Sequence, residues 1–299
     1  MNDLLGGQKS PYSKPSGQLV FFSLLLALGY LFAIFIMSSI VPFFPGAFGE
    51  NGEVASASYL RIAQVIQFAV LMFMPVMVYM NTVAPMEDKA AFNPAADNRH
   101  YVWAILGFAV ALPFIDELAN INRMMELPGW LGGIQKWMQE GEATSERLIR
   151  LMLETKVHSA VLLNFAIMVV MPAVCEEFLF RGVLQQKLTQ IWKNPWWAII
   201  ATGFIFSAIH FQFLTFLPRF VQGIALGYLF YASGSIWVAV AAHFANNLFA
   251  LLFYYYIMFR HPELDPQKID TTSGNMWMVV SSMVLAVYFI QKVRLAKKP

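Results

Sequence analysis

Residues 19–43 of this 299-residue chain read LVFFSLLLALGYLFAIFIMSSIVPF, and this stretch decides the fold. Its 25 residues include no Asp, Glu, Lys or Arg. A helix crosses the ~30 Å hydrocarbon core of a bilayer with about 20 mainly apolar residues. The run is too long for the core of a signal peptide, and no small-residue cleavage site follows it. We therefore predict a retained first membrane span.

The rest of the chain repeats this pattern. Hydrophobic residues make up 58% of the sequence and charged residues 13%, and the mean hydropathy is +0.56. These values are far more apolar than those of soluble domains. The long apolar runs predict about eight membrane helices, at residues 19–43, 57–81, 101–115, 158–182, 196–213, 214–232, 235–259 and 274–291. The predicted fold class is all-α: a polytopic membrane helix bundle in which residues 1–299 form a single integral membrane domain.

Composition also excludes some classes of function. The formal net charge is +2 and the basic residues are scattered, so we predict no nucleic-acid partner. Cys175 is the single cysteine, which excludes an internal disulfide and any cysteine-based zinc or iron-sulfur cluster. Residues 116–157 form the one long polar segment. Here we predict amphipathic helices at the membrane interface, and a lid is the alternative.

Basic residues near the span ends predict the orientation. They lie before the first span (Lys9, Lys14), between the fourth and fifth (Lys187, Lys193) and after the last (Lys292, Arg294, Lys297, Lys298). The 44–56 loop has no Lys or Arg, as expected on the opposite face. We predict a multi-pass protein of a prokaryotic plasma membrane, with both termini cytoplasmic. Arg61, Arg219, Asp116 and Glu117 lie near predicted span ends, and we expect them to reach the headgroups.

Some charged residues fall inside the predicted spans. Each costs on the order of +2.5 to +3.5 kcal/mol near the bilayer centre, so it needs a partner or a function. The fourth span ends in MPAVCEEFLFRG at residues 171–182. Glu177 and Arg181 are four residues apart and can pair on one helix face. Glu176 points about 100° away from Glu177, so one carboxylate can be structural while the other faces a cavity.

Two further spans carry polar motifs. The fifth contains Phe206 and His210, and the seventh contains His243 and Asn247 on one helix face. Together with Glu176 they suit proton transfer to or from water, with donors for a developing oxyanion. The residues Glu176, His210 and His243 equally suit a divalent metal such as zinc, with a position open for water. The pattern leaves both chemistries open. Counted from the predicted span ends at 1.5 Å per residue, Glu176 would lie ~9–12 Å deep in the membrane and His210 ~20 Å deep. These two depths differ, although both residues would have to meet at one site.

The three ordered motifs resemble those of the CPBP intramembrane proteases, also called the CAAX protease or abortive-infection family, which includes the Ras-converting CAAX endopeptidase. The similarity covers residues 172–247 and extends to Pro172, Gly223, Gly227 and the Gly234–Trp237 run. Within the membrane domain, residues 158–259 would be the catalytic helices. The family is described both as metalloproteases and as glutamate-dependent proteases.

This resemblance implies an intramembrane endopeptidase that hydrolyses a membrane-associated or lipid-modified peptide or protein. Glu176 and His210 would activate water, and His243 and Asn247 would stabilise the oxyanion. Glu177, Arg181 and Phe206 would support the site. If a metal is used, its ligands would be Glu176, His210 and His243. The implied partners are membrane lipids and the substrate, and the oligomeric state stays open.

Three other interpretations remain at this point. The chain could be a non-proteolytic scaffold or bacteriocin-immunity factor of the same fold. It could instead be a proton-coupled transporter, since buried carboxylates also mark transport pathways. Cys175 could act as a nucleophile with a histidine base.

Overall fold

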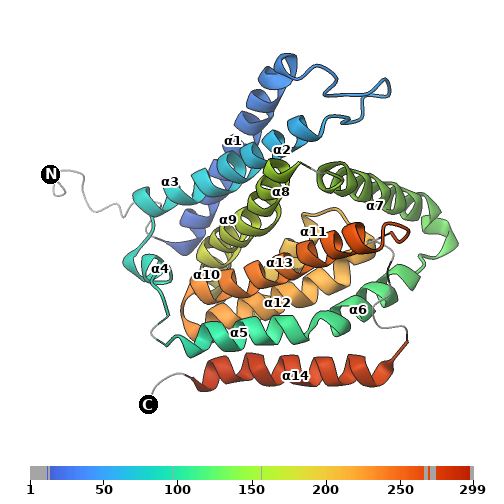
Figure 1. The fold of residues 1–299 in the computed structure, drawn as a ribbon. Coiled ribbons are helices and arrows are strands. Elements are labelled where there is room, and N and C mark those ends of the chain that lie inside the picture. Colours follow the sequence, from blue (N-terminus) through green and yellow to red (C-terminus); the bar gives the residue numbers. More distant parts are fainter. Residues whose placement is uncertain are drawn as a thin grey trace, which may run out of the picture.

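The computed structural model describes residues 12, 14–95, 97–155, 157–265, 269 and 274–296. Within these residues every regular element is helical, and one isolated β-bridge joins Phe48 to Val54. Figure 1 shows the helices packed into one bundle. The all-α fold class is therefore confirmed.

Six helical segments of the described chain are long and apolar enough to span a membrane, or seven if one bent pair counts as a span. They are Pro15–Phe43, Ala57–Thr82, His158–Trp192, Phe213–Ser233, Ile236–Arg260 and Met276–Leu295. The bent pair joins α5 (Arg99–Val110) to α6 (Leu112–Met124) at 46°. Pro113 lies at the start of α6, where its ring and missing N–H interrupt the helical ladder. The predicted third span is thus two helices.

The predicted fifth span is shorter than expected. It is α11 (Pro195–Ala208), whose 14 residues extend ~21 Å, less than the thickness of a bilayer core. The number of eight spans is therefore not confirmed. Asn194 caps α11 by accepting from the backbone N–H groups of Trp196 and Trp197.

A 35-residue helical segment, residues 158–192, forms the centre of the molecule. It contains α8 (His158–Phe165), α9 (Met171–Leu179) and α10 (Gln186–Trp192), joined by the π-helical segments η5 (Ala166–Val170) and η6 (Phe180–Gln185). Pro172 explains η5, because a proline removes one backbone hydrogen bond from the preceding turn. The same relation links Pro75 to η3 (Gln67–Phe73), which lies between α2 (Ala57–Ile66) and α3 (Met74–Thr82).

This segment ends ten residues beyond the predicted boundary at 182, and the difference removes the disagreement in depth. Glu176 lies 16 residues before the end at Trp192, ~24 Å along the helix. His210 lies 15 residues after the start of α11 at Pro195, ~22 Å along the chain if it stayed helical. The wrong boundary was therefore that of the fourth span.

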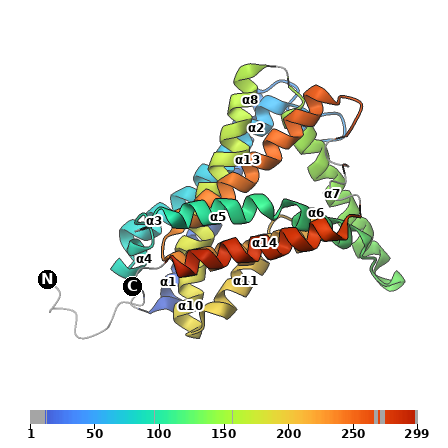
Figure 2. The ribbon, with the colours of Figure 1, turned by 60° about the horizontal axis from the view of Figure 1, so that its bottom comes forward.

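The polar segment 116–157 is largely helical. After the end of α6 it contains the short η4 (Gly129–Leu131) and α7 (Gly132–Leu153). Figure 2 shows α7 set apart from the long helices, and it contacts α2 and η7 (Phe213–Thr215). The predicted amphipathic helix is present, and its apolar side faces the bundle.

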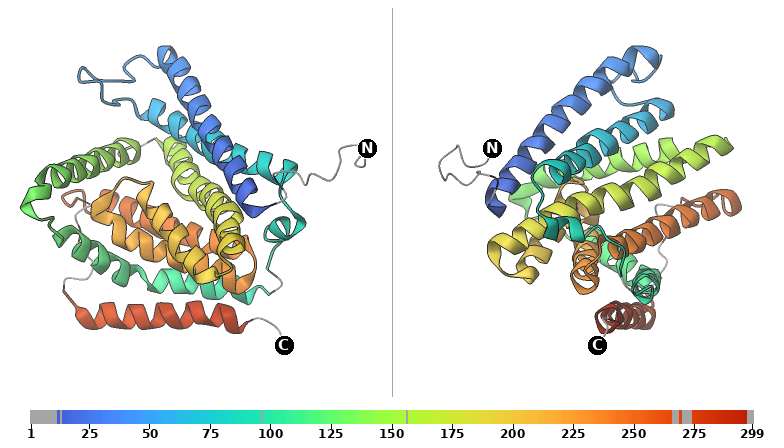
Figure 3. Two further views of the ribbon diagram at one scale, coloured as in Figure 1. Left: turned by 180° about the vertical axis from the view of Figure 1, so that it is seen from behind. Right: turned by 90° about the vertical axis from the view of Figure 1, so that its left-hand side faces the viewer.

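The remaining helices surround the central segment. They are α1 (Pro15–Ile40), which continues into η2 (Val41–Phe43), α4 (Met86–Ala90), α12 (Phe216–Ser233), α13 (Ile236–Arg260) and α14 (Met276–Leu295). Figure 3 shows α1 and α14 on opposite sides of the molecule, with α14 lying along α5. A Cβ on Gly223 of α12 would lie 2.9 Å from the Cα of Gly203 in α11, so the glycine permits the close approach of these two helices.

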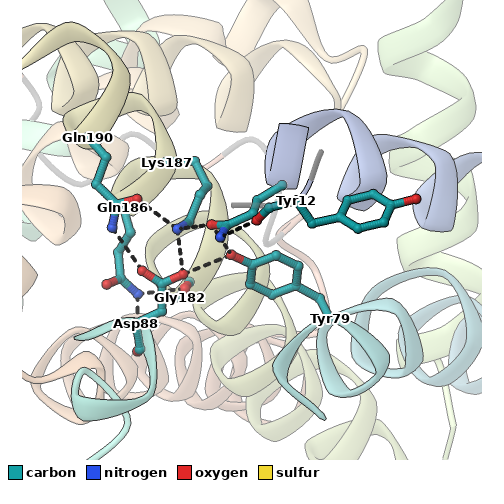
Figure 4. Close-up of polar contacts among 8 residues, drawn as sticks. Tyr12, Tyr79, Asp88, Gly182, Gln186, Lys187 and Gln190 are labelled. Atoms are coloured by element: carbon teal, nitrogen blue, oxygen red, sulfur yellow. Dashed lines mark hydrogen bonds and ion pairs between the residues drawn. The ribbon is translucent and has the colours of Figure 1, made fainter. Parts of the chain in front are cut away.

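A buried ion pair joins α4 to α10 (Figure 4). The Lys187 ammonium lies 2.6 Å from Asp88 Oδ2, and both side chains are fully buried. Lys187 also donates to Gln18 of α1 at 2.7 Å, while Tyr79 of α3 donates to Asp88 at 2.8 Å. Gln190 donates to the other carboxylate oxygen of Asp88 at 2.9 Å. Four separate helices are therefore fastened together through one network.

Two predictions about basic residues are corrected by these contacts. Lys187 is not a loop residue, so it no longer counts toward the orientation, and Lys9, Lys297 and Lys298 lie outside the described residues. Arg61 does not reach the headgroups. It is buried and donates to Asn164 Oδ1 at 2.8 Å and to the carbonyl oxygen of Met152 at 2.6 Å. Its hydrogen-bond partners are therefore acceptors inside the protein and not lipid headgroups.

Candidate active site

The site starts from an ion pair on the central helix. Arg181 Nη1 donates to Glu177 Oε1 at 2.7 Å, and both side chains are fully buried. Arg181 Nη2 donates to the carbonyl oxygen of Gly223 at 2.8 Å. The predicted pairing at four-residue spacing is present, and it also anchors α12. A buried charge of this kind requires its partner, because removing one member leaves the other uncompensated.

Glu177 also orients a histidine of α13. Its Oε1 atom lies 2.8 Å from His243 Nδ1, and His243 is buried. An ionised carboxylate only accepts hydrogen bonds, so Nδ1 carries a proton and Nε2 is the atom turned toward Glu176. The distance from Nε2 to Glu176 Oε2 is 3.9 Å, which is long for a direct hydrogen bond. Glu176 and His243 therefore face each other without a direct hydrogen bond.

His210 lies in the turn that follows α11. Its Nδ1 atom is 2.7 Å from the carbonyl oxygen of Phe206, so Nδ1 donates and Nε2 is left as an acceptor in the neutral ring. Phe206 is buried, and its ring packs edge-on against both His210 and His243. The Arg181 guanidinium lies 5.0 Å from the centroid of the same ring, within cation–π range. Phe206 thus holds three polar side chains in place.

The four predicted catalytic residues line one cavity of about 510 Å³. Glu176, His210, His243 and Asn247 come from the central helix, the turn after α11 and α13. The rest of the lining mixes apolar and polar side chains, and helices α2, α7 and α12 contribute to it together with η3 and η5. Ser145, Leu148, Ile149 and Met152 form the contribution of α7. The amphipathic segment is thus a wall of this cavity, a role that its sequence alone left undecided.

Some residues of the cavity were missed at the level of sequence. Arg219 was expected at the headgroups, but it lines the cavity and donates to Thr215 at 2.8 Å and to Gln212. Gln222 and Asn246 also line it. No motif marks these residues in the sequence. The one available signal is that Gln222 lies three residues, about one helical turn, after Arg219. Glu142 of α7 lies close to Thr215, and burial raises the pKa of its carboxyl group.

The arrangement of these groups bears on the two chemistries left open. Among the described residues, no three His, Cys, Asp or Glu side chains are gathered as a metal site would require. His243 uses Nδ1 for Glu177, and its Nε2 is the atom that faces Glu176. The described residues do not fit a bound metal, so no step is derived through one. Cys175 is buried and is not part of the cavity lining.

Part of the chain, including this site, is similar to known proteins. Residues 158–249 match the family described as Rce1-like, type II CAAX prenyl endopeptidase Rce1-like. Over 101 residues the chain is 31% identical to the uncharacterized protein YyaK of Bacillus subtilis (strain 168), a match that covers 29% of this chain and 32% of that protein. The matched part is thus about a third of the relative's length. No solved structure matches significantly.

The matched segment includes all of the predicted site residues, from Glu176 on the central helix to Asn247 on α13. Its boundaries also enclose the residues that the structure added to the cavity from α12. Residues 158–249 are therefore similar to the Rce1-like family.

Proposed function

We propose that this protein is an intramembrane endopeptidase that hydrolyses a peptide bond of a membrane-associated or lipid-modified peptide or protein. The observation that carries the proposal is the convergence of Glu176, His210, His243 and Asn247 on one cavity among membrane-spanning helices. The similarity to the Rce1-like family supports the same reaction class. The apolar residues of its lining, among them Leu148, Ile149 and Met168, suit an apolar substrate segment.

In the first step Glu176 and His210 act on water. The Glu176 carboxylate accepts one proton of the water while the oxygen adds to the scissile carbonyl carbon. His210 presents Nε2 as an acceptor and holds the second hydrogen of the water, because its Nδ1 donates to the Phe206 carbonyl. These contacts orient a nucleophile that is scarce in a dry environment.

The oxyanion that forms requires donors on the other side of the carbonyl group. His243 and the Asn247 amide supply them in this proposal. Glu177 holds Nδ1 of His243, so donation by Nε2 requires an imidazolium. In this scheme both carboxylates, Glu176 and Glu177, are ionised, and both Arg181 and His243 are positively charged. The four groups together therefore carry no net charge.

Collapse of the tetrahedral intermediate completes the reaction. The carbon–nitrogen bond breaks, and Glu176 returns its proton to the leaving amine nitrogen. The products are a carboxylic acid and an amine, so one water is consumed and no proton is left on the protein. Protein atoms line the cavity, and a fixed dipole close to the reacting atoms acts on them more strongly than it would in bulk water.

The proposal includes a location in the cell. We place the protein as a multi-pass component of a prokaryotic plasma membrane with both termini in the cytoplasm. Lys14 before α1, Lys193 between α10 and α11, and Lys292 and Arg294 in the last turn of α14 support this orientation. Reporter fusions at the two ends of the chain, and at the 44–56 loop, measure the orientation directly.

The test of activity is cleavage of a membrane-peptide library by the purified protein in detergent. Wild type and Glu176→Gln are compared at matched concentration, with a chelator added in parallel. We expect cleavage by wild type alone. Equal cleavage by the variant would refute the role of Glu176. If neither protein cleaves and both are folded, binding without proteolysis and proton-coupled flux into proteoliposomes become the functions to measure.

A further inference from the structure

Three side-chain amides form a chain that ends at the catalytic cavity. Gln222 of α12 donates from Nε2 to Asn246 Oδ1 at 2.9 Å. Asn246 of α13 donates from Nδ2 to the Oδ1 of its neighbour Asn247 at 3.3 Å. The carbonyl oxygen of Asn247 is thereby engaged on the side of Asn246. The amide group of Asn247 consequently directs its N–H donors away from Asn246.

The chain has a direction because each amide has one accepting end and one donating end. If Gln222 presents Nε2, Asn246 must present Oδ1 to it and Nδ2 to Asn247. Reversing the first amide would therefore reverse the second and turn the oxygen of Asn247 outward. An outward oxygen would repel the oxyanion that the proposed reaction creates, whereas an outward N–H donor stabilises it.

The surroundings of Gln222 and Asn246 disfavour such a reversal. Both residues line the catalytic cavity and also a second pocket of about 250 Å³. That second pocket lies between α5, α6, α12 and α14, and its lining is mainly apolar, with Phe114, Ile224 and Met283 among its residues. The amides therefore have few alternative partners on that side, and their mutual hydrogen bonds determine their orientation.

The start of the chain is itself held in place. Gln222 precedes Gly223, whose carbonyl oxygen accepts from the buried Arg181. Gly223 also packs directly on Gly203 of α11, where a Cβ would not fit. The backbone at Gln222 is therefore fixed by the same ion pair that orients His243. Both oxyanion donors therefore depend on the Glu177–Arg181 pair. His243 depends on it through Glu177, and Asn247 depends on it through Arg181 and the backbone next to Gln222.

We propose that Gln222 and Asn246 are positioning residues that orient the Asn247 amide so that it donates to the oxyanion. This inference rests on the proposed protease function. Neither residue touches the reacting atoms in this scheme, so both act through Asn247. Their loss should lower kcat and leave KM nearly unchanged, because the oxyanion develops in the transition state and is absent from the bound substrate.

The test uses the full-length protein and a substrate that wild type cleaves. Asn246→Leu removes the middle amide at similar volume, and we expect kcat to fall about 10- to 100-fold with KM within about twofold, less than the loss of a direct oxyanion donor. Gln222→Met, one step further away, should lower kcat less. The double variant should be no worse than Asn246→Leu, because the chain is already broken. Asn81→Leu, at an exposed position of α3, is the matched control.

A rescue separates positioning from packing. In Asn246→Asp, a protonated carboxyl group can accept from Gln222 and donate to Asn247, whereas an ionised one cannot donate. Its kcat relative to wild type should therefore rise as the pH falls and exceed that of Asn246→Leu. The other titratable groups that line the two pockets are Glu176, His210, Arg219, His243 and Tyr228. They are the same in both proteins, so the ratio of the two kcat values corrects for their titration.

Each outcome decides between the alternatives. A kcat within twofold of wild type for Asn246→Leu would overturn the inference, as would additive losses in the double variant. An acid-insensitive Asn246→Asp no better than Asn246→Leu would also overturn it, since packing alone would then explain the loss. The protease function is judged separately: it fails if folded wild-type protein cleaves no substrate, and the role of Glu176 fails if Glu176→Gln retains wild-type cleavage.

Discussion

Two buried ion pairs involve the same helical segment, residues 158–192, and they differ in what surrounds them. At the α10 end, Lys187 and Asp88 are enclosed by Gln18, Tyr79 and Gln190, and neither residue of this pair lines the catalytic cavity or the second pocket (Figure 4). In the middle, Arg181 and Glu177 pass their contacts on to His243, which borders the cavity of about 510 Å³. We call the Lys187–Asp88 network closed, because its contacts serve only to fasten helices together. We call the Glu177–Arg181–His243 network open, because it orients a side chain that borders the cavity.

The largest expected effect comes from the open side of the comparison. Glu176→Gln keeps the size of the side chain but removes the base, and we expect cleavage to fall about 10²- to 10⁴-fold. The thermal midpoint in detergent should change little, because Glu176 borders the cavity and lies 3.9 Å from His243 Nε2, too far for a direct hydrogen bond. A kcat equal to wild type would show that the open network is not catalytic.

Breaking the central ion pair should affect both stability and activity. Arg181→Met leaves Glu177 charged and buried, and we expect a loss of about 3–5 kcal/mol in the free energy of unfolding. Cleavage should also fall, because the Glu177 carboxylate no longer holds His243 in the same way. Adding Glu177→Gln should restore much of the thermal midpoint but not the activity. Recovery of both would mean that the pair only fastens helices.

The closed network provides the matched case. Lys187→Met should lower the free energy of unfolding by a similar amount, about 3–5 kcal/mol, because Asp88 is left buried without its partner. The kcat of the folded fraction should stay within about twofold of wild type. The double change Lys187→Met with Asp88→Asn should recover stability. A selective loss of kcat at full folding would contradict the separation of the two networks.

The smallest expected effect is that of metal removal. The described residues gather no three-residue metal cluster, so dialysis against a chelator should leave cleavage within about twofold of the untreated enzyme. Elemental analysis of the active protein, before and after dialysis, is the accompanying measurement. Activity lost on dialysis and regained with one divalent metal would show that the side chains rearrange to bind it.

The sequence by itself determined those features that depend on neighbours along the chain. Hydrophobic length predicts membrane spans because the bilayer requires about 20 residues, and six such segments are present. Four-residue spacing predicts the Glu177–Arg181 pair because helical geometry brings those positions together. The candidate site residues were singled out in the same way, as polar groups in predicted spans that should exclude them.

The tertiary structure alone decided where a polar residue of a membrane helix finds its partner. Such a side chain either reaches the headgroups or turns inward, and the choice depends on acceptors contributed by distant helices. Lys187 meets Asp88, Arg61 meets Asn164, and Gln222 meets Asn246 across 24 residues of chain. Helical periodicity describes which face a residue lies on, but not which other helix that face meets.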